Sequence, residues 1–239
     1  MYSVKEKCFD ICEKAVRCLF PKRCPVCDNL IPLNEDYCAC LNQQSVKISE
    51  DFCRHCGAQR DKCSCKSPNS VYLPEITAVY IYGGRIRADI LNLKFGNEKR
   101  LALKLGTAMA ERCANVYSST DFDIVSFVPM TKKALTKRTY NQSQLLARQV
   151  GKMLLVPVEE LFVKTRNTKA QHGLGGNERL ENVKNSVILT QGADVKGKSI
   201  LICDDVKTTG ATLNQCVQAL KAGGAEKICC VCAAIADFS

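Results

Sequence analysis

Hydrophobic and polar positions change their pattern near residue 70. From there to the end of the chain, short apolar runs alternate with amphipathic segments of helical length. The apolar runs predict strands at residues 76–82, 123–129, 160–165, 198–205 and 227–236. The amphipathic segments predict helices at residues 86–96, 101–117, 141–154 and 211–224. Because apolar strands separated by helices are typical of a parallel sheet covered on both faces, we predict an α/β domain over residues 71–239.

The first part of the chain lacks this alternation and is rich in cysteine. Residues 1–22 have the pattern of an amphipathic helix, whereas residues 23–66 are polar and contain two similar sets of a Cys-x2-Cys pair followed by a Cys-x-Cys pair. The eight cysteines of these sets are Cys24, Cys27, Cys38, Cys40, Cys53, Cys56, Cys63 and Cys65. In a reducing compartment such cysteines indicate metal binding before disulfides. We therefore predict a double zinc ribbon over residues 23–66, folded by metal ligation, with a linker at residues 67–70.

Several ligand arrangements are compatible with these spacings. The eight thiolates form two sites, or a single site is built from Cys24, Cys27, Cys53 and Cys56, and His55 is a possible substitute ligand. An iron–sulfur cluster uses the same ligands. Without a metal the cysteines would be buried free thiols, for which this polar segment has no core. Cys8 and Cys12 share a face of the first helix, where they are expected in a core, with a metal-ligand pair as the alternative.

Composition and charge indicate a globular protein with one basic domain. The longest apolar run, residues 228–236, is far too short to span a membrane, and residues 1–23 lack the apolar core of a secretion signal. We expect a cytoplasmic protein without membrane insertion. Of the net charge of +10, residues 1–66 contribute +2 (eleven basic against nine acidic residues) and the remainder +8 (twenty-three against fifteen). The α/β domain is therefore expected to bind an anion such as polyphosphate or single-stranded nucleic acid.

One stretch matches the P-loop pattern by its letters alone. Residues 192–199, GADVKGKS, have the required glycines, lysine and serine, and a hydrophobic run ending in Asp204 and Asp205 follows them. A P-loop must leave a strand and open a helix. Here the segment leads directly into a predicted strand, and five positions from Ser199 to Asp204 leave no room for a helix. We therefore reject an ATPase site.

The most informative motif is ILICDDVKTTGATL, residues 200–213, in which an apolar strand ends in two carboxylates. Neighbouring aspartates repel each other, so packing alone does not favour the pair. The threonine- and glycine-rich turn after them opens a predicted helix, and a helix N-terminus favours phosphate. Carboxylates accept hydrogen bonds from vicinal hydroxyls or help to hold Mg²⁺. A ribose 5-phosphate fits this order of groups; the alternative is a solvated loop with a threonine N-cap.

The same residues resemble the phosphoribosyl pyrophosphate (PRPP) motif of type I phosphoribosyltransferases. With the cysteine segment, two further stretches, residues 127–147 (FVPMTKKALTKRTYNQSQLLA) and 166–183 (RNTKAQHGLGGNERLENV), resemble the ComF family. These competence-associated, ComFC-like phosphoribosyltransferases carry an N-terminal double zinc ribbon. The resemblance covers nearly the whole chain. It implies a type I phosphoribosyltransferase-like parallel sheet flanked by helices, PRPP as ligand, Mg²⁺ as its cofactor, and a role in natural competence and DNA uptake.

The resemblance also assigns roles by position. Asp204 and Asp205 would be the catalytic carboxylates that bind the ribose hydroxyls. The 5-phosphate loop would contain Lys207, Thr208, Thr209, Gly210, Ala211 and Thr212. The pyrophosphate side would contain Met130, Thr131, Lys132, Lys133, Arg138 and Asn141, and a mobile loop over the site would supply Arg166, Gln171 and Arg179. Two departures touch the pyrophosphate side: Val128-Pro129-Met130 stands where the family has Pro-x-Pro, and Thr139-Tyr140 where it has Gly-Phe.

Two functions are compatible with this assignment. An enzyme would transfer the phosphoribosyl group of PRPP to an acceptor that the sequence does not identify, mostly by electrostatic catalysis. A non-catalytic protein would bind single-stranded DNA or regulate a competence helicase-like translocase. Scarce aromatic residues argue against a base-stacking platform, and Tyr80, Tyr82 and Phe95 are expected in packing positions. We further expect that a zinc chelator unfolds residues 24–65 and leaves the α/β domain largely intact.

Overall fold

A computed structural model of the chain describes residues 21, 23, 30–31, 45–63, 65, 73–117, 121–164 and 186–236. Several predicted features lie outside these residues: the N-terminal helix, the linker at 67–70, and the loop that contains Arg166, Gln171 and Arg179. The first cysteine set, Cys24, Cys27, Cys38 and Cys40, also lies outside them, as do Cys8 and Cys12.

Four parallel strands form the central sheet, in the order β1 (Ile76–Ile81), β6 (Lys227–Ile235), β5 (Ser199–Lys207) and β2 (Ile124–Phe127). The two middle strands are the longest and bury most of their side chains, because parallel strands in the centre of a covered sheet meet helices on both sides. Cys203 in β5 pairs with Val231 in β6 and with Phe127 in β2, so all three strands end at the same edge. The predicted architecture, a parallel sheet flanked by helices, is confirmed.

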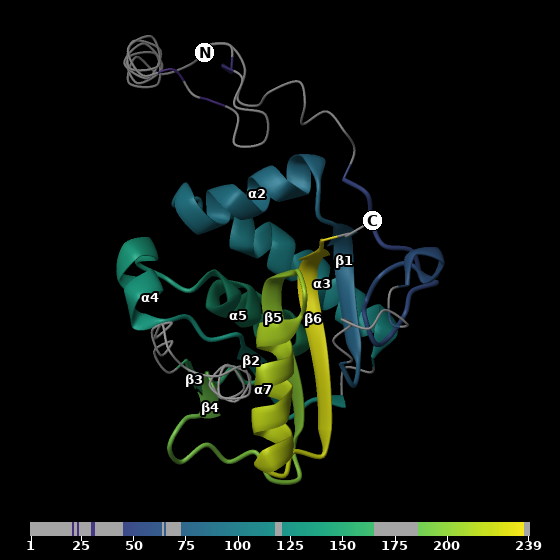
Figure 1. Cartoon of the computed structure of the whole chain (residues 1–239), viewed down its shortest axis with the longest axis vertical. Coiled ribbons are helices and arrows are strands. Elements are labelled where there is room, and N and C mark those ends of the chain that lie inside the picture. Colours follow the sequence, from purple (N-terminus) through teal and green to yellow (C-terminus); the bar gives the residue numbers. More distant parts are fainter. Residues whose placement is uncertain are drawn as a thin grey trace, which may run out of the picture.

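Helices cover both faces of this sheet (Figure 1). Three helices cover one face: α2 (Gly84–Phe95), α3 (Leu101–Val116) and α5 (Gln142–Leu154). Their apolar positions form one core with the side chains that β5 and β6 direct to this face. Helix α7 (Ala211–Ala222) packs on the other face, in a second core that also takes Ile48 and Phe52. Helix α2 lies beyond the carboxyl ends of the strands. Among the described residues, no helix has the length and apolar character needed to cross a membrane.

The structure differs from the predicted elements in three places. The predicted strand at 160–165 shortens to β3 (Phe162–Lys164) and pairs antiparallel with an unpredicted strand, β4 (Val187–Leu189), in a small separate sheet. A short helix, α4 (Lys132–Arg138), was also not predicted. It buries no residue, so its sequence has no apolar stripe that would indicate a helix. Strand β5 starts at Ser199, the last of the P-loop-like letters, so these letters lead into a strand and not into the helix that a P-loop opens.

The second half of the cysteine segment packs against the edge of the sheet rather than forming a detached module. Residues 46–48 extend the sheet by pairing with β1: the Ile48 amide donates to the Val79 carbonyl (2.9 Å), and the Ile81 amide donates to the Val46 carbonyl (2.9 Å). Arg112 in α3 fixes the same segment, since it donates to the Ser49 carbonyl (2.9 Å) and its guanidinium lies 4.5 Å from the centre of the Phe52 ring. Loss of the cysteine segment would therefore expose the edge strand of the α/β domain.

Candidate functional site

Asp204 lies half-buried at the carboxyl end of β5. Its Oδ1 accepts hydrogen bonds from the Ser143 hydroxyl (2.9 Å) and from the Asp205 amide (2.8 Å). Burial and then the adjacent charge of Asp205 raise the pKa of Asp204, whereas these two hydrogen bonds and the ammonium of Lys94 lower it, and the net pKa is about 7. The carboxylate is thus held in place while its charge is only partly compensated, as expected of a group that meets a hydroxyl or a cation.

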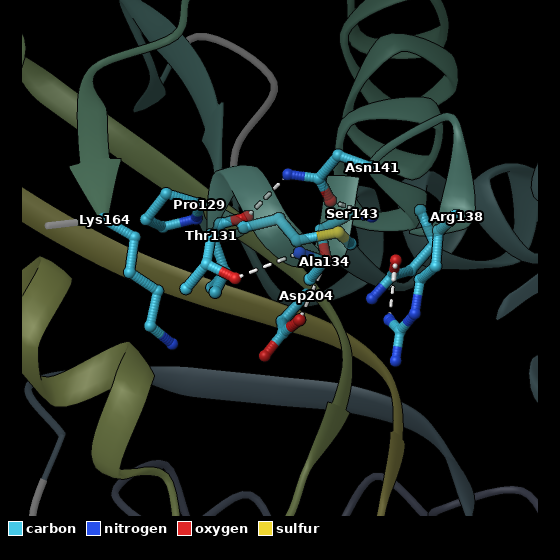
Figure 2. A pocket seen from close by; sticks show the side chains of 11 residues that line it. Pro129, Thr131, Ala134, Arg138, Asn141, Ser143, Lys164 and Asp204 are labelled. Atoms are coloured by element: carbon cyan, nitrogen blue, oxygen red, sulfur yellow. Dashed lines mark hydrogen bonds between the residues drawn. The ribbon is translucent and has the colours of Figure 1, made fainter. Parts of the chain in front are cut away.

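Asp204 forms part of an open cavity of about 420 Å³ between β5, the end of β2 and the start of α5 (Figure 2). Its lining combines a short apolar loop with polar side chains. The lining residues are Val128, Pro129, Met130, Thr131, Ala134, Arg138, Asn141, Gln142, Ser143, Lys164 and Asp204. The carboxylate of Asp204 and the side chain of Lys164 extend into the same space from different strands. An anionic ligand with hydroxyl groups would meet both charges here.

The loop after β2 is held by caps at both of its ends. Thr131 is the N-cap of α4, and its Oγ1 accepts from the Ala134 amide (3.2 Å). Asn141 is the N-cap of α5: its Oδ1 accepts from the Ser143 amide (3.0 Å) while its Nδ2 donates to the Val128 carbonyl (3.0 Å). Asn141 therefore connects the loop to α5 and orients Ser143, which holds Asp204. This is a positioning role, in addition to any contact with ligand.

Thr139 occupies a conformation that glycine adopts more easily. It is the C-cap of α4 with φ 64°, in the left-handed region, and its amide donates to the Leu135 carbonyl (2.7 Å). A β-branched side chain is strained there. The family pattern has glycine at this position, so the structure gives the sequence departure a physical meaning: the turn is retained at some cost in backbone strain.

The predicted phosphate loop forms the turn from β5 into α7. Gly210 is the N-cap of α7 with φ 80°, which favours glycine, and the Thr209 hydroxyl accepts from the Ala211 amide (3.3 Å). Thr208 and Thr209 are exposed, whereas Lys207 is buried as the last residue of β5. The N-terminus of α7 and the hydroxyls of the exposed Thr208 and Thr209 lie at the same sheet edge as Asp204, which is the arrangement expected of a phosphate-binding site.

The structure brings together only part of the predicted site. Asp204, Met130, Thr131, Arg138 and Asn141 line the cavity. Lys132 and Lys133 are exposed on α4 and do not line it, and neither does the turn at 207–212. Asp205 points to the opposite face of β5, where its Oδ2 lies 2.8 Å from Lys94 Nζ of α2.

Three polar lining residues were missed from the sequence, Lys164, Gln142 and Ser143, and so were the apolar Val128, Pro129 and Ala134. Lys164 had a usable signal, because it lies at the end of a predicted strand, where ligands bind in α/β folds. The Arg138 guanidinium donates to Gln142 Oε1 (3.3 Å) and lies 4.6 Å from the centre of the Phe95 ring. Phe95 is 62% exposed, so the expectation that it is packed was wrong, whereas Tyr80 is buried as expected.

Four cysteines of the second set form a candidate metal site. Cys53, Cys56, Cys63 and Cys65 place their Sγ atoms within 4.8 Å of one another, with 3.6 Å between Cys53 and Cys65 and 3.8 Å between Cys56 and Cys63. Thiolates arranged tetrahedrally around zinc are about 3.8 Å apart, given Zn–S bonds of about 2.3 Å. The four therefore fit one zinc ion without a contribution from the first set, which favours one site per set over a site shared between Cys-x2-Cys pairs.

The thiols of the cluster differ in their pKa. Burial raises the pKa of Cys53, but hydrogen bonds from backbone amides and from the neighbouring thiols lower it to about 6. Burial and the neighbouring thiols raise the pKa of Cys56 and Cys65 above the ordinary value. A cation would stabilise all four thiolates together. His55 is not one of this set, and its Nδ1 lies 3.2 Å from the Leu73 carbonyl oxygen.

Comparisons with known proteins agree with this architecture. Residues 140–237 match the family model of the phosphoribosyl transferase domain. The chain is 25% identical over 222 residues to the DNA utilization protein YhgH of Escherichia coli O157:H7, covering 89% of this chain and 97% of that protein.

Two competence proteins are also similar to the chain. It is 32% identical over 103 residues to competence protein F of Haemophilus influenzae, covering 42% of this chain and 45% of that protein. It is 24% identical over 194 residues to competence protein ComFC of Bacillus subtilis, covering 77% and 78% of the two chains.

Proposed function

We propose that this chain, a ComF-family phosphoribosyltransferase-like protein, binds PRPP or a related ribose 5-phosphate at the carboxyl ends of β5 and β2. The observation that carries the proposal is the position of Asp204. Its carboxylate faces a cavity lined by cationic and polar side chains, at the same edge of the sheet as the helix N-terminus at Gly210. A diol at Asp204 and a phosphate at the turn 208–212 would use both features at once.

Each chain group then has a separate task. The hydroxyls of Thr208 and Thr209 and the amides of the turn would bind the 5-phosphate, and Asp204 would accept from a ribose hydroxyl. Arg138 and Lys164, the two cationic side chains of the cavity, would bind the pyrophosphate group. The exposed Lys132 and Lys133 contribute only to the surrounding positive potential in this proposal.

Mg²⁺ fits the donor set of this cavity. Mg²⁺ prefers carboxylate oxygens in combination with substrate phosphates, and Asp204 offers a carboxylate whose charge is only partly compensated. When bound, the ion would neutralise pyrophosphate and strengthen it as a leaving group. The chain's own residues would hold the ribose in place and supply positive charge on the pyrophosphate side.

We also propose that the site has kept transfer chemistry, with an acceptor still to be identified. The bond from the anomeric carbon to pyrophosphate would break with its electron pair on pyrophosphate, and a lone pair of the acceptor would form the new bond. Arg138 and Lys164 would stabilise the departing charge. The names of the relatives, which refer to competence and DNA utilization, suggest that the product or the binding event serves DNA uptake.

Direct binding of single-stranded DNA is a second candidate function. The observation that favours it is the row of exposed lysines on α4, Lys132, Lys133 and Lys137, outside the cavity. This surface is independent of Asp204. A helicase-like partner would be a further proposal of the same kind.

Isothermal titration calorimetry of PRPP with Mg²⁺ into the zinc-loaded protein tests the first proposal. We expect binding by the wild type and by Asp194→Asn, an exposed acid with the same change of charge, and at least tenfold weaker binding by Asp204→Asn. Equal heats for all three proteins, or none, would reject the ribose-phosphate site. Anisotropy of a labelled oligothymidylate with Lys132→Ala, Lys133→Ala and Lys137→Ala combined then tests the second candidate.

A further inference from the structure

The two adjacent aspartates of the motif have different surroundings. Asp204 faces the cavity, whereas Asp205 is 4% exposed and lies on the opposite face of β5. Asp205 Oδ1 accepts from the Val206 amide (2.7 Å). Its Oδ2 is buried and makes no hydrogen bond within the described part of the chain. The charge that compensates this oxygen is the ammonium of Lys94, 2.8 Å away.

Lys94 is fixed where it stands, because the end of α2 is attached to the α4–α5 junction by three contacts. The Tyr140 hydroxyl donates to the Leu93 carbonyl, next to Lys94 in the chain. The Arg138 guanidinium lies 4.6 Å from the ring centre of Phe95, the residue after Lys94. Lys99 Nζ lies 5.0 Å from the centre of the Tyr140 ring. Lys94 therefore lies at a helix end that is held in place, with its side chain 20% exposed.

We propose that Lys94 is a positioning residue that acts as the permanent counterion of Asp205, so that only Asp204 is left to bind a ligand hydroxyl or a divalent cation. This deepens the proposed function, and its application to ribose phosphates rests on that proposal. The pair lets β5 carry two consecutive carboxylates without mutual repulsion opening the strand end. It also links α2 to the motif, and Phe95 at the end of α2 contacts Arg138, which lines the cavity.

The pair makes a specific prediction about cations. When a buried carboxylate loses its counterion, its negative charge is uncompensated and destabilises the folded protein. If Lys94 is replaced by an apolar residue of similar length, the buried Asp205 carboxylate loses the ammonium 2.8 Å from its Oδ2. A divalent cation would then be drawn to Asp205 from the side that the ammonium occupied, and the charge of Asp204 on the other face would add attraction without direct ligation. A residue with a purely structural role would give no such gain.

The test is the affinity for Mn²⁺ alone, measured by electron paramagnetic resonance on the zinc-loaded full chain. We expect Lys94→Met to bind Mn²⁺ at least about tenfold more tightly than the wild type. Lys94→Arg should behave as the wild type, since it keeps the charge, and Lys94→Met with Asp205→Asn should lose the gain. The control is Lys104→Met: Lys104 also pairs with a buried acid, Asp89 (3.1 Å), but Arg85 still compensates that acid (2.7 Å).

An unchanged Mn²⁺ affinity in a folded Lys94→Met protein overturns the inference. If Lys94→Met does not fold, the variant that also carries Asp205→Asn decides: recovery of the wild-type melting temperature supports the counterion role, and a second failure to fold overturns it. Calorimetry with ribose 5-phosphate and Mg²⁺ is run beside it. A gain of Mn²⁺ binding without ribose 5-phosphate binding by the wild type would retain the inference and reject the proposed function.

Discussion

Replacing Asp204 by asparagine should stabilise the protein at neutral and alkaline pH while it removes ligand binding. Burial raises the pKa of Asp204 from its ordinary value of 3.8 to about 7, so the folded state disfavours the ionised form. The difference corresponds to about 4 kcal/mol, at about 1.4 kcal/mol for each tenfold change in proton affinity. Solvent in the open cavity screens part of this, and we expect about 2–4 kcal/mol.

The sign of the effect fixes its pH dependence. Because the folded-state pKa is raised, the contribution of Asp204 to stability is fully present below about pH 4 and is lost as the pH rises to about 7. Asparagine keeps an oxygen that accepts from Ser143 and from the Asp205 amide, but it has no charge to lose. The variant should therefore match the wild type near pH 4 and exceed it by about 2–4 kcal/mol at pH 8.

Urea unfolding of both proteins at intervals from pH 4 to pH 8 measures this difference directly. Asp194→Asn, at an exposed acid, serves as the matched control and should follow the wild-type curve. A difference between Asp204→Asn and wild type that is the same at every pH would refute the reasoning, because a lost contact would explain it as well as a lost charge. Ligand affinity of the wild type should rise over the same pH range, since binding requires the carboxylate.

Three further predictions address the other parts of the site and the metal. Removal of zinc by a chelator should increase hydrogen exchange of amides in β1 as well as in the cysteine segment, because residues 46–48 pair with that strand. If the chelator leaves the protection of β1 unchanged, the prediction is contradicted and the ribbon is independent of the α/β domain, as expected from the sequence. Thr139→Gly should raise the free energy of unfolding by about 0.5–1 kcal/mol, since it relieves a left-handed β-branched residue at the cost of greater chain entropy; a lower midpoint in urea would count against it. Lys164→Ala should weaken pyrophosphate binding about tenfold in calorimetry, whereas Lys152→Ala, on the exposed side of α5, should leave it unchanged.

Much of the fold could be read from the order of apolar runs. The four strands of the central sheet and all helices with a buried apolar stripe were predicted, because periodicity reports burial directly. Helix α4 and strand β4 were missed for the same reason: α4 buries no residue, and β4 is three residues long. Their existence depends on caps and on pairing with β3 rather than on a local pattern.

The location of the candidate site was predicted from the sequence, but the different positions of its two aspartates were not. Alternation along a strand places consecutive side chains on opposite faces, so Asp204 and Asp205 could not both have faced one ligand from a regular strand. That signal was available in the sequence. The partner of Asp205 was not, because Lys94 is distant along the chain and reaches the strand end only through the packing of α2.

The sequence by itself determined the α/β architecture, the acidic strand end before a glycine turn, and the pairing of cysteines into sets with metal-ligand spacing. These are local features, set by side-chain periodicity and by the geometry of short turns. Tertiary structure alone decided which carboxylate faces the cavity, that Lys164 joins it, and that the cysteine segment extends the edge of the sheet. Each of these depends on contacts between residues remote in sequence, whose distances are fixed only when the two cores on either side of the sheet are packed.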